Sequence, residues 1–171
     1  MRTMLCVVAL VALVALSGCA TNVQHFTDAD TPRLIRANET IRNVAVSLTD
    51  AGQKEFADNT DFDQASLLAS VKRQLQSKQL LIEAQGGDAL EIKISSMRVR
   101  STFNAVMWGF MAGSDNVTGE VYLRDPSGKL INHFQVHASY ALGGFVGGIQ
   151  SVRWDWLYNK FAELTVKNLT E

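Results

Sequence analysis

The chain has 171 residues and a formal net charge of −1, and hydrophobic residues make up 47% of it. This length suits one ordinary domain. The near-neutral charge argues against a nucleic-acid partner, which would require a strongly basic surface.

The chain begins like a secretory precursor. Met1–Thr3 carries one positive charge, and Met4–Leu16 is almost wholly apolar. The apolar run fits the core of a signal peptide and is shorter than the ~20 residues of a membrane-spanning helix. Leu16–Cys19 reads Leu-Ser-Gly-Cys, which resembles the lipobox of bacterial lipoproteins. We therefore predict a signal peptide over residues 1–18, with cleavage between Gly18 and Cys19.

The lipobox resemblance implies that Cys19 is acylated and anchors the protein in a lipid bilayer. Ala20 follows the cysteine, as in lipoproteins sorted to the outer membrane. The alternative is a plain secretory signal in which Cys19 is an ordinary residue. Cys6 lies in the segment to be removed, so Cys19 would then be a lone thiol in an oxidising compartment, which favours the lipoprotein interpretation.

Residues 19–40 are polar and have no clear period, which predicts a flexible tether. A single domain is expected over residues 41–171. Its first strand covers residues 41–48, where apolar residues recur, and a polar loop runs on to about Asp61. Apolar residues at helical spacing from Ala65 to Leu75 then predict an amphipathic helix, with Asp61 or Asp63 as its N-cap.

Residues 89–100 predict a long strand with a β-bulge near Ser95–Ser96, where the alternation changes phase. Strands over 117–123 and 129–140 flank the turn sequence Asp125–Gly128 and form a hairpin. The apolar spacing from Trp154 to Leu164 predicts a C-terminal helix with Ser151 as its cap. We predict an α+β fold, in which a mainly antiparallel sheet of four to five strands carries two helices on one face.

Two uncharged, glycine-rich segments interrupt this regular pattern: residues 103–113, the first arm, and residues 140–149, the second arm. Glycines spaced four apart allow close backbone approach, and aromatic residues on loops need a cover. The arms could pack on the domain, contact another copy or contact lipid. The candidate interface or membrane-contact residues are Trp108, Gly109, Phe110, Gly113, Gly143, Gly144, Phe145, Gly147 and Gly148.

No pattern typical of an active site or a metal site stands out. His133 and His137 are about 13 Å apart if they lie on one strand, so we interpret them as solvent-facing residues. The Asp58–Asp63 segment does not have the spacing of a calcium-binding loop. Ser114–Asn116 matches one motif of penicillin-recognising serine enzymes without its companion motifs, and we interpret it as a turn. We therefore predict no catalytic residue, no cofactor and no metal.

The lipobox, the strand Ile41–Val46, the hairpin Asp125–Leu130 and the Gly-Gly-Phe-Val-Gly-Gly stretch together resemble small bacterial outer-membrane lipoproteins of unknown function. The element order is also similar to the domain of the curli-secretion channel lipoprotein. The resemblance implies a non-enzymatic lipoprotein that faces the periplasm and acts as an accessory or assembly component of an envelope complex, with a protein partner or self-association. The alternative is a membrane-active or pore-forming homo-oligomer that uses the arms.

Overall fold

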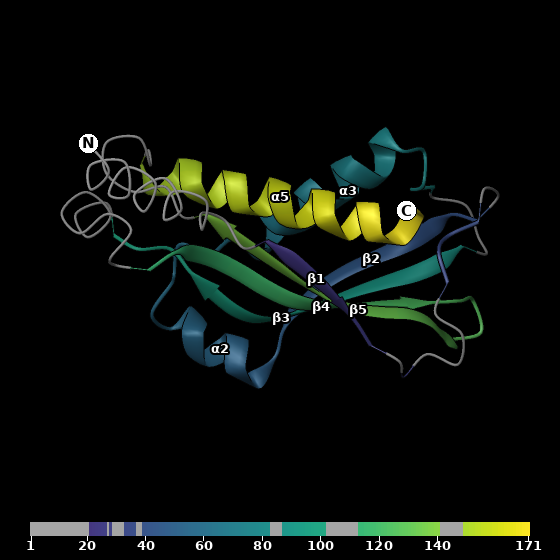
Figure 1. Ribbon diagram of the computed structural model, residues 1–171, viewed down its shortest axis with the longest axis horizontal. Helices are drawn as coiled ribbons and strands as arrows, with labels where there is room; N and C mark the ends of the chain where they lie inside the picture. The colour runs from purple at the N-terminus through teal and green to yellow at the C-terminus, as the bar shows by residue number, and fades with distance from the viewer. Residues whose placement is uncertain are drawn as a thin grey trace, which may run out of the picture.

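The fold is a sheet with two long helices on one face, as Figure 1 shows. The computed structural model describes residues 21–26, 28, 33–36, 39–82, 87–101, 113–140 and 149–171. Within these ranges the helices α3 (Gln64–Ser77) and α5 (Gln150–Thr170) pack against each other, and a short helix α2 (Asp50–Phe56) lies apart from them. The predicted α+β class is confirmed.

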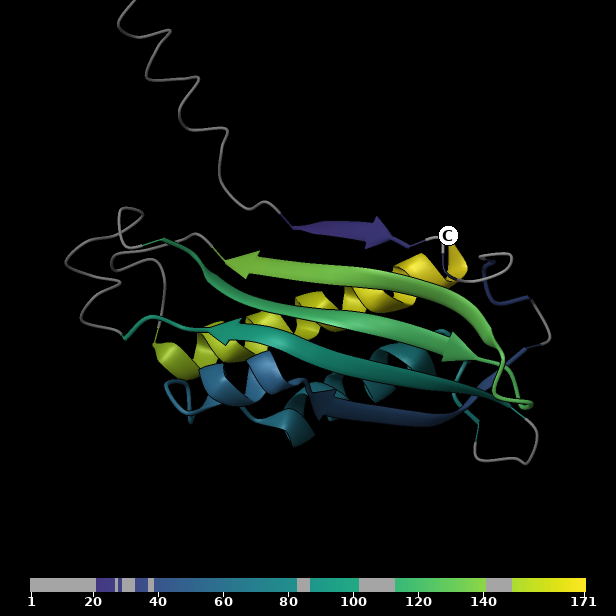
Figure 2. The same ribbon diagram turned by 90° about the horizontal axis from the view of Figure 1, so that it is seen from below.

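The sheet has five strands in the order β1–β5–β4–β3–β2. The bounds of these strands are Asn22–His25, Leu130–Tyr140, Asp115–Arg124, Asp88–Arg98 and Ile41–Leu48, respectively. β2 and β3 run parallel, while every other pair is antiparallel. The sheet is therefore mixed but mostly antiparallel, and Figure 2 shows its long strands running side by side from the face that α3 and α5 leave uncovered.

The buried core lies between the sheet and the α3–α5 layer. Leu67, Val71 and Leu75 of α3 and Leu157 and Phe161 of α5 are fully buried, as their helical spacing predicts. The N-cap of α3 is Asp63, whose carboxylate accepts a hydrogen bond from the amide of Ala65 at 2.8 Å. The amphipathic pattern therefore places α3 correctly.

Two local predictions about the strands are confirmed. The register of β3 against β4 shifts between Ile94 and Ser96, which is the predicted bulge. The turn after β4 is closed by hydrogen bonds from the amide of Asp125 to the carbonyl of Lys129 and from the amide of Gly128 to the carbonyl of Asp125, both 2.9 Å. Gly128 has a φ of +88°, which glycine adopts without the steric cost of a side chain.

The predicted cap of α5 is wrong. The helix begins one residue before Ser151, and its N-cap is Ile149, which has no side chain able to cap the helix. Because α5 is long and buries one whole face, packing stabilises it without a capping side chain.

Part of the predicted tether is an ordered edge strand. Residues 22–25 form β1, which pairs with β5 from Asn22 opposite His137 to His25 opposite Phe134. The prediction of a flexible tether is therefore wrong for these four residues. A short, polar edge strand is stabilised mainly by backbone hydrogen bonds to its neighbour, so it leaves little periodic signal in the sequence.

The predicted loop after β2 contains the helix α2. Its N-cap Thr49 accepts a hydrogen bond from the amide of Gly52 at 3.1 Å, and Glu55 accepts one from the amide of Met97 at 2.8 Å. α2 thus provides a hydrogen-bond partner for the backbone at the edge of β3 beyond the point where β2 ends. A seven-residue helix is too short to be stable by itself, so its formation depends on this tertiary contact.

Candidate functional site

The described chain on either side of both arms lies at one end of the sheet. β3 ends where Arg98 pairs with Asn116, and β4 begins where Asp115 pairs with Tyr140, the last residue of β5. The first arm connects β3 to β4, and the second connects β5 to α5. We call this region the arm end. The opposite end of the sheet, which holds the turn Asp125–Lys129, is the turn end.

A buried cluster of charged residues joins these connections at the arm end. Asp115 accepts a hydrogen bond from Arg100 Nε at 2.8 Å on one carboxylate oxygen and from Arg153 Nη1 at 2.7 Å on the other. Arg153 also donates to the carbonyl of Arg100 at 2.7 Å. All three side chains are at most 1% exposed. We call this cluster the Arg100–Asp115–Arg153 triad.

The triad has one carboxylate for two guanidinium groups. Charges taken out of water are stabilised only by close opposite charges and hydrogen bonds, so both arginines depend on Asp115. Arg100 precedes the first arm, Asp115 follows it, and Arg153 follows the second arm. The triad therefore holds the chain at both ends of the first arm and beyond the second arm in one fixed arrangement.

The structure corrects the interpretation of Ser114–Asn116 as a turn. Asp115 is the first residue of β4 and is fully buried in the triad. The sequence offered one signal for this cluster: charged residues lie on either side of the uncharged arms. Their mutual contacts are long-range, however, and cannot be read from spacing.

The N-terminal strand approaches the same end. Asn22 pairs with His137, three residues before the end of β5 at Tyr140. β1 is antiparallel to β5, so the chain before Asn22 leads toward the arm end. Figure 2 shows β1 beginning on the side where β5 ends. Cys19 is three residues before Asn22, a length of chain that spans about 11 Å at most.

Most predicted contact and lipidation residues lie outside the described residues. This holds for Gly18, Cys19 and every candidate in the arms except Gly113. Gly113 has a φ of +86°, a backbone conformation that side chains disfavour. It therefore allows a tight change of direction just before β4.

The prediction that His133 faces solvent is wrong. Its ring is stacked on Tyr122 with centroids 4.1 Å apart, and its two nitrogens lie 2.7 Å from Asp28 and 3.3 Å from Glu120. The segment after β1 covers it. His137 is partly exposed and contacts Thr118. Among the described residues, no group of three or more His, Cys, Asp or Glu side chains is arranged so that it could hold a metal ion.

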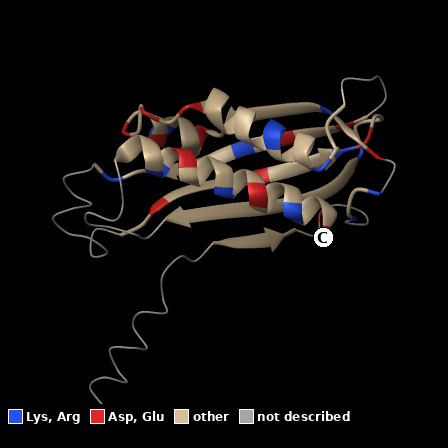
Figure 3. Ribbon diagram, turned by 90° about the horizontal axis from the view of Figure 1, so that it is seen from above, with Lys and Arg blue, Asp and Glu red and all other residues tan. Residues whose placement is uncertain are grey.

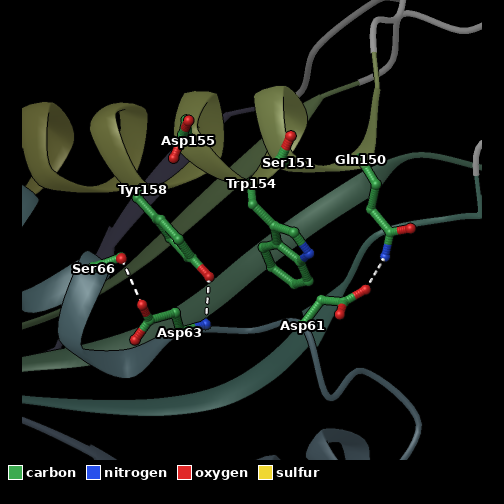
Figure 4. Close-up of a pocket in the computed structure, with 8 residues that line it drawn as sticks. All are labelled: Asp61, Asp63, Ser66, Gln150, Ser151, Trp154, Asp155 and Tyr158. Carbon is green, nitrogen blue, oxygen red and sulfur yellow. Dashed lines mark hydrogen bonds between the residues drawn. The ribbon is translucent and has the colours of Figure 1, made fainter.

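A groove opens between the N-terminal turns of α3 and α5 (Figure 4). It has a volume of about 380 Å³. Tyr158 accepts a hydrogen bond from the amide of Asp63 at 2.7 Å, and Gln150 donates one to Asp61 at 2.7 Å. Burial raises the pKa of Tyr158 to about 12, so this phenol stays protonated at neutral pH. We call this feature the α3–α5 groove; the sequence had indicated only a cap at Asp61 or Asp63.

The fold and the arm end define a small α+β domain with an N-terminal edge strand. The profile of a family described as "Domain of unknown function (DUF4410)" matches residues 25–144, and the chain belongs to this family. No curated protein matches the chain. None of the described helices is long and apolar enough to cross a membrane.

Two similar solved structures support the same fold. They are the PelC dodecamer from Paraburkholderia phytofirmans (TM-score 0.52) and a dodecamer of a single-substitution variant of the same protein (TM-score 0.50). Each is 12% identical to this chain and covers 88% of it, and the chain covers 99% and 98% of the two, respectively. At this identity the likeness concerns the fold alone.

Proposed function

We propose that this protein is a non-enzymatic, lipid-anchored component of the bacterial outer membrane, with its domain in the periplasm. In this proposal Cys19 carries the lipid, and the two arms form the contact surface of the domain. The observation that carries the proposal is the position of Asn22, which lies at the same end of the sheet as the chain flanking both arms.

This arrangement would keep the arms close to the bilayer. Acyl chains on Cys19 hold the chain in the membrane, because each buried methylene contributes roughly 0.8 kcal/mol. The two residues between Cys19 and β1 leave little separation between the lipid surface and the arm end. The arms contain no charged residue, so contact with lipid or with an apolar partner would leave no buried charge unpaired.

The charged groups at the arm end favour a structural role over catalysis. The Arg100–Asp115–Arg153 triad is buried, and its members bond to one another. A catalytic group must reach a substrate, whereas these side chains hold the backbone that carries the arms. We therefore propose an accessory or assembly role and no reaction.

A second candidate function is self-assembly through the arms into a membrane-active or pore-forming homo-oligomer. The similar PelC structures are described as dodecamers, which favours this organisation. The glycines of the second arm, spaced four apart, would also permit close contact between copies. In this case the arms would contact neighbouring subunits as well as lipid.

The proposal is tested by replacing an arm residue with a charged one in the full chain. Trp108→Asp or Phe145→Asp should weaken binding to vesicles of phosphatidylethanolamine and phosphatidylglycerol in flotation assays on protein that lacks the anchor through Cys19→Ala. Leu34→Asp in the same background is the matched control, because Leu34 is 42% exposed and lies near the turn end.

Two further measurements complete the test. Mass spectrometry of the protein with its native Cys19 should show a diacylglyceryl group, and light scattering in detergent should show whether the arm variants change the oligomeric state. Equal vesicle binding and equal size for the arm variants and the Leu34 control would contradict a contact role. An unmodified Cys19 in the mature protein would contradict the anchor.

A further inference from the structure

The α3–α5 groove consists of two adjoining depressions that share lining residues. Its larger depression, of about 380 Å³, and a neighbouring one of about 310 Å³ share Ser66, Asp155 and Tyr158. Arg73 and Asn159 also line the second depression. Together they lie between α3 and α5 and are open to solvent.

A buried hydrogen-bond donor faces this groove without a partner. Trp154 is only 4% exposed, and its indole Nε1 has no acceptor within hydrogen-bond distance in the part of the chain that the structure describes. Figure 4 shows the indole nitrogen on the side of the ring toward Gln150 and Asp61. Buried donors are nearly always satisfied, so a ligand that brings an acceptor here would complete the site.

The walls of the larger depression are acidic. Asp61, Asp63 and Asp155 line it, and none of its eight lining residues is basic. Hydrogen bonds from Ser66 hold the pKa of Asp63 below its usual range, which keeps this carboxylate ionised. Figure 3 shows acidic segments where α3 begins, whereas both charge signs alternate along α5. The larger depression therefore favours a positively charged ligand.

The carboxylates are spread along the groove and do not surround one point. Among the described residues they form no cluster that could hold a metal ion. The ligand must therefore offer separate groups: a carbonyl acceptor for the indole of Trp154 and cationic donors for the carboxylates. A peptide segment with arginine or lysine side chains offers both, because a backbone carbonyl lies beside each basic side chain.

We propose that the α3–α5 groove binds a basic peptide segment of a partner protein. A backbone carbonyl of the segment accepts from Trp154 Nε1, and its basic side chains bond to Asp61 and Asp155. This site is formed by the helix layer and is separate from the contact role proposed for the arms. Its test uses a different measurement, so either proposal can fail without the other.

The indole N–H of Trp154 reports binding directly. The full chain with Cys19→Ala is produced with ¹⁵N-labelled tryptophan and kept in detergent, and Trp154→Phe identifies the Trp154 signal. Titration with the peptide acetyl-Gly-Arg-Gly-Arg-Gly-amide should shift this signal downfield, as a new hydrogen bond requires. Spermidine has positive charge but no acceptor, and acetyl-Gly-Gln-Gly-Gln-Gly-amide has acceptors but no charge. Neither should produce the same saturable shift.

Charge-neutralising variants sharpen the result. Asp61→Asn and Asp155→Asn should each weaken peptide affinity by up to about five-fold, the range of exposed ion pairs, and added salt should weaken it further. Glu163→Gln on α5 removes the same charge away from the groove and should leave affinity unchanged. The proposal is overturned if the Trp154 signal does not move with the basic peptide, or if it moves equally with the uncharged peptide. It is also overturned if Asp61→Asn and Asp155→Asn bind the basic peptide as well as Glu163→Gln does while circular dichroism shows that they are folded.

Discussion

The two ends of the sheet hold their connecting segments in different ways. At the turn end, β4 and β5 are joined by a few residues held by local hydrogen bonds: Asp125 accepts from Ser127 and Lys129. At the arm end, the connections are long, and residues far apart in the sequence hold them. Arg153 contacts Asp115 across 38 positions. Local chemistry determines the first end, and tertiary structure determines the second.

The largest effect should come from the triad. Asp115→Asn removes the buried carboxylate that pairs with both Arg100 and Arg153 in the triad. We expect the free energy of unfolding to fall by about 3–5 kcal/mol, as for other broken buried ion pairs. Urea denaturation followed by circular dichroism measures this change.

The matched variant at the turn end is Asp125→Asn. It removes an exposed carboxylate of the same type and should have a much smaller effect on the urea midpoint. Equal losses for the two variants would mean that the triad contributes no more to stability than a surface turn does, and the contrast between the ends would be wrong.

Replacing glycine should have an intermediate effect on stability, and the cause should differ between Gly119 in the sheet and Gly128 in the turn. A Cβ at Gly119 would lie 2.7 Å from Ile94 Cδ1 and 3.3 Å from Phe161 Cζ, so Gly119→Ala should cost about 1–3 kcal/mol through overpacking. A Cβ at Gly128 would meet nothing within 4 Å, and only its positive φ opposes a side chain. Gly128→Ala should therefore cost about 1–2 kcal/mol.

Asparagine separates these two causes, because it tolerates positive φ better than alanine but is larger. Thermal unfolding should show that Gly128→Asn retains more stability than Gly128→Ala, whereas Gly119→Asn is worse than Gly119→Ala. The reverse order at either position would show that the assigned cause is incorrect.

The smallest effect should be the acid sensitivity of the turn end. Hydrogen bonds from Ser127, together with the amide of Lys129, hold the pKa of Asp125 below its ordinary value of 3.8. A lowered pKa in the folded state means that this stabilisation is present above the unfolded value and is lost as pH falls through the folded value. Wild-type protein should therefore lose a small stabilisation below pH 3.8 that Asp125→Asn lacks. A variant with the same acid dependence as wild type would contradict this assignment.

The sequence alone was enough to predict the regular elements that carry their own signal. Alternation placed β2, β4 and β5, and the phase change in β3 predicted the bulge between Ile94 and Ser96. Helical spacing and a capping aspartate located α3. These features depend on neighbouring residues only, because strand alternation, capping and turn geometry are local properties of the backbone.

Only the tertiary structure decided the remaining features. β1 forms because β5 offers it an unpaired edge, and α2 forms because Glu55 and Thr49 bond to β3. His133 is buried because Asp28, distant in sequence, lies over it. The triad and the α3–α5 groove likewise join residues from separate elements. Such contacts have no fixed spacing along the chain, so the sequence contains their residues but the fold alone brings them together.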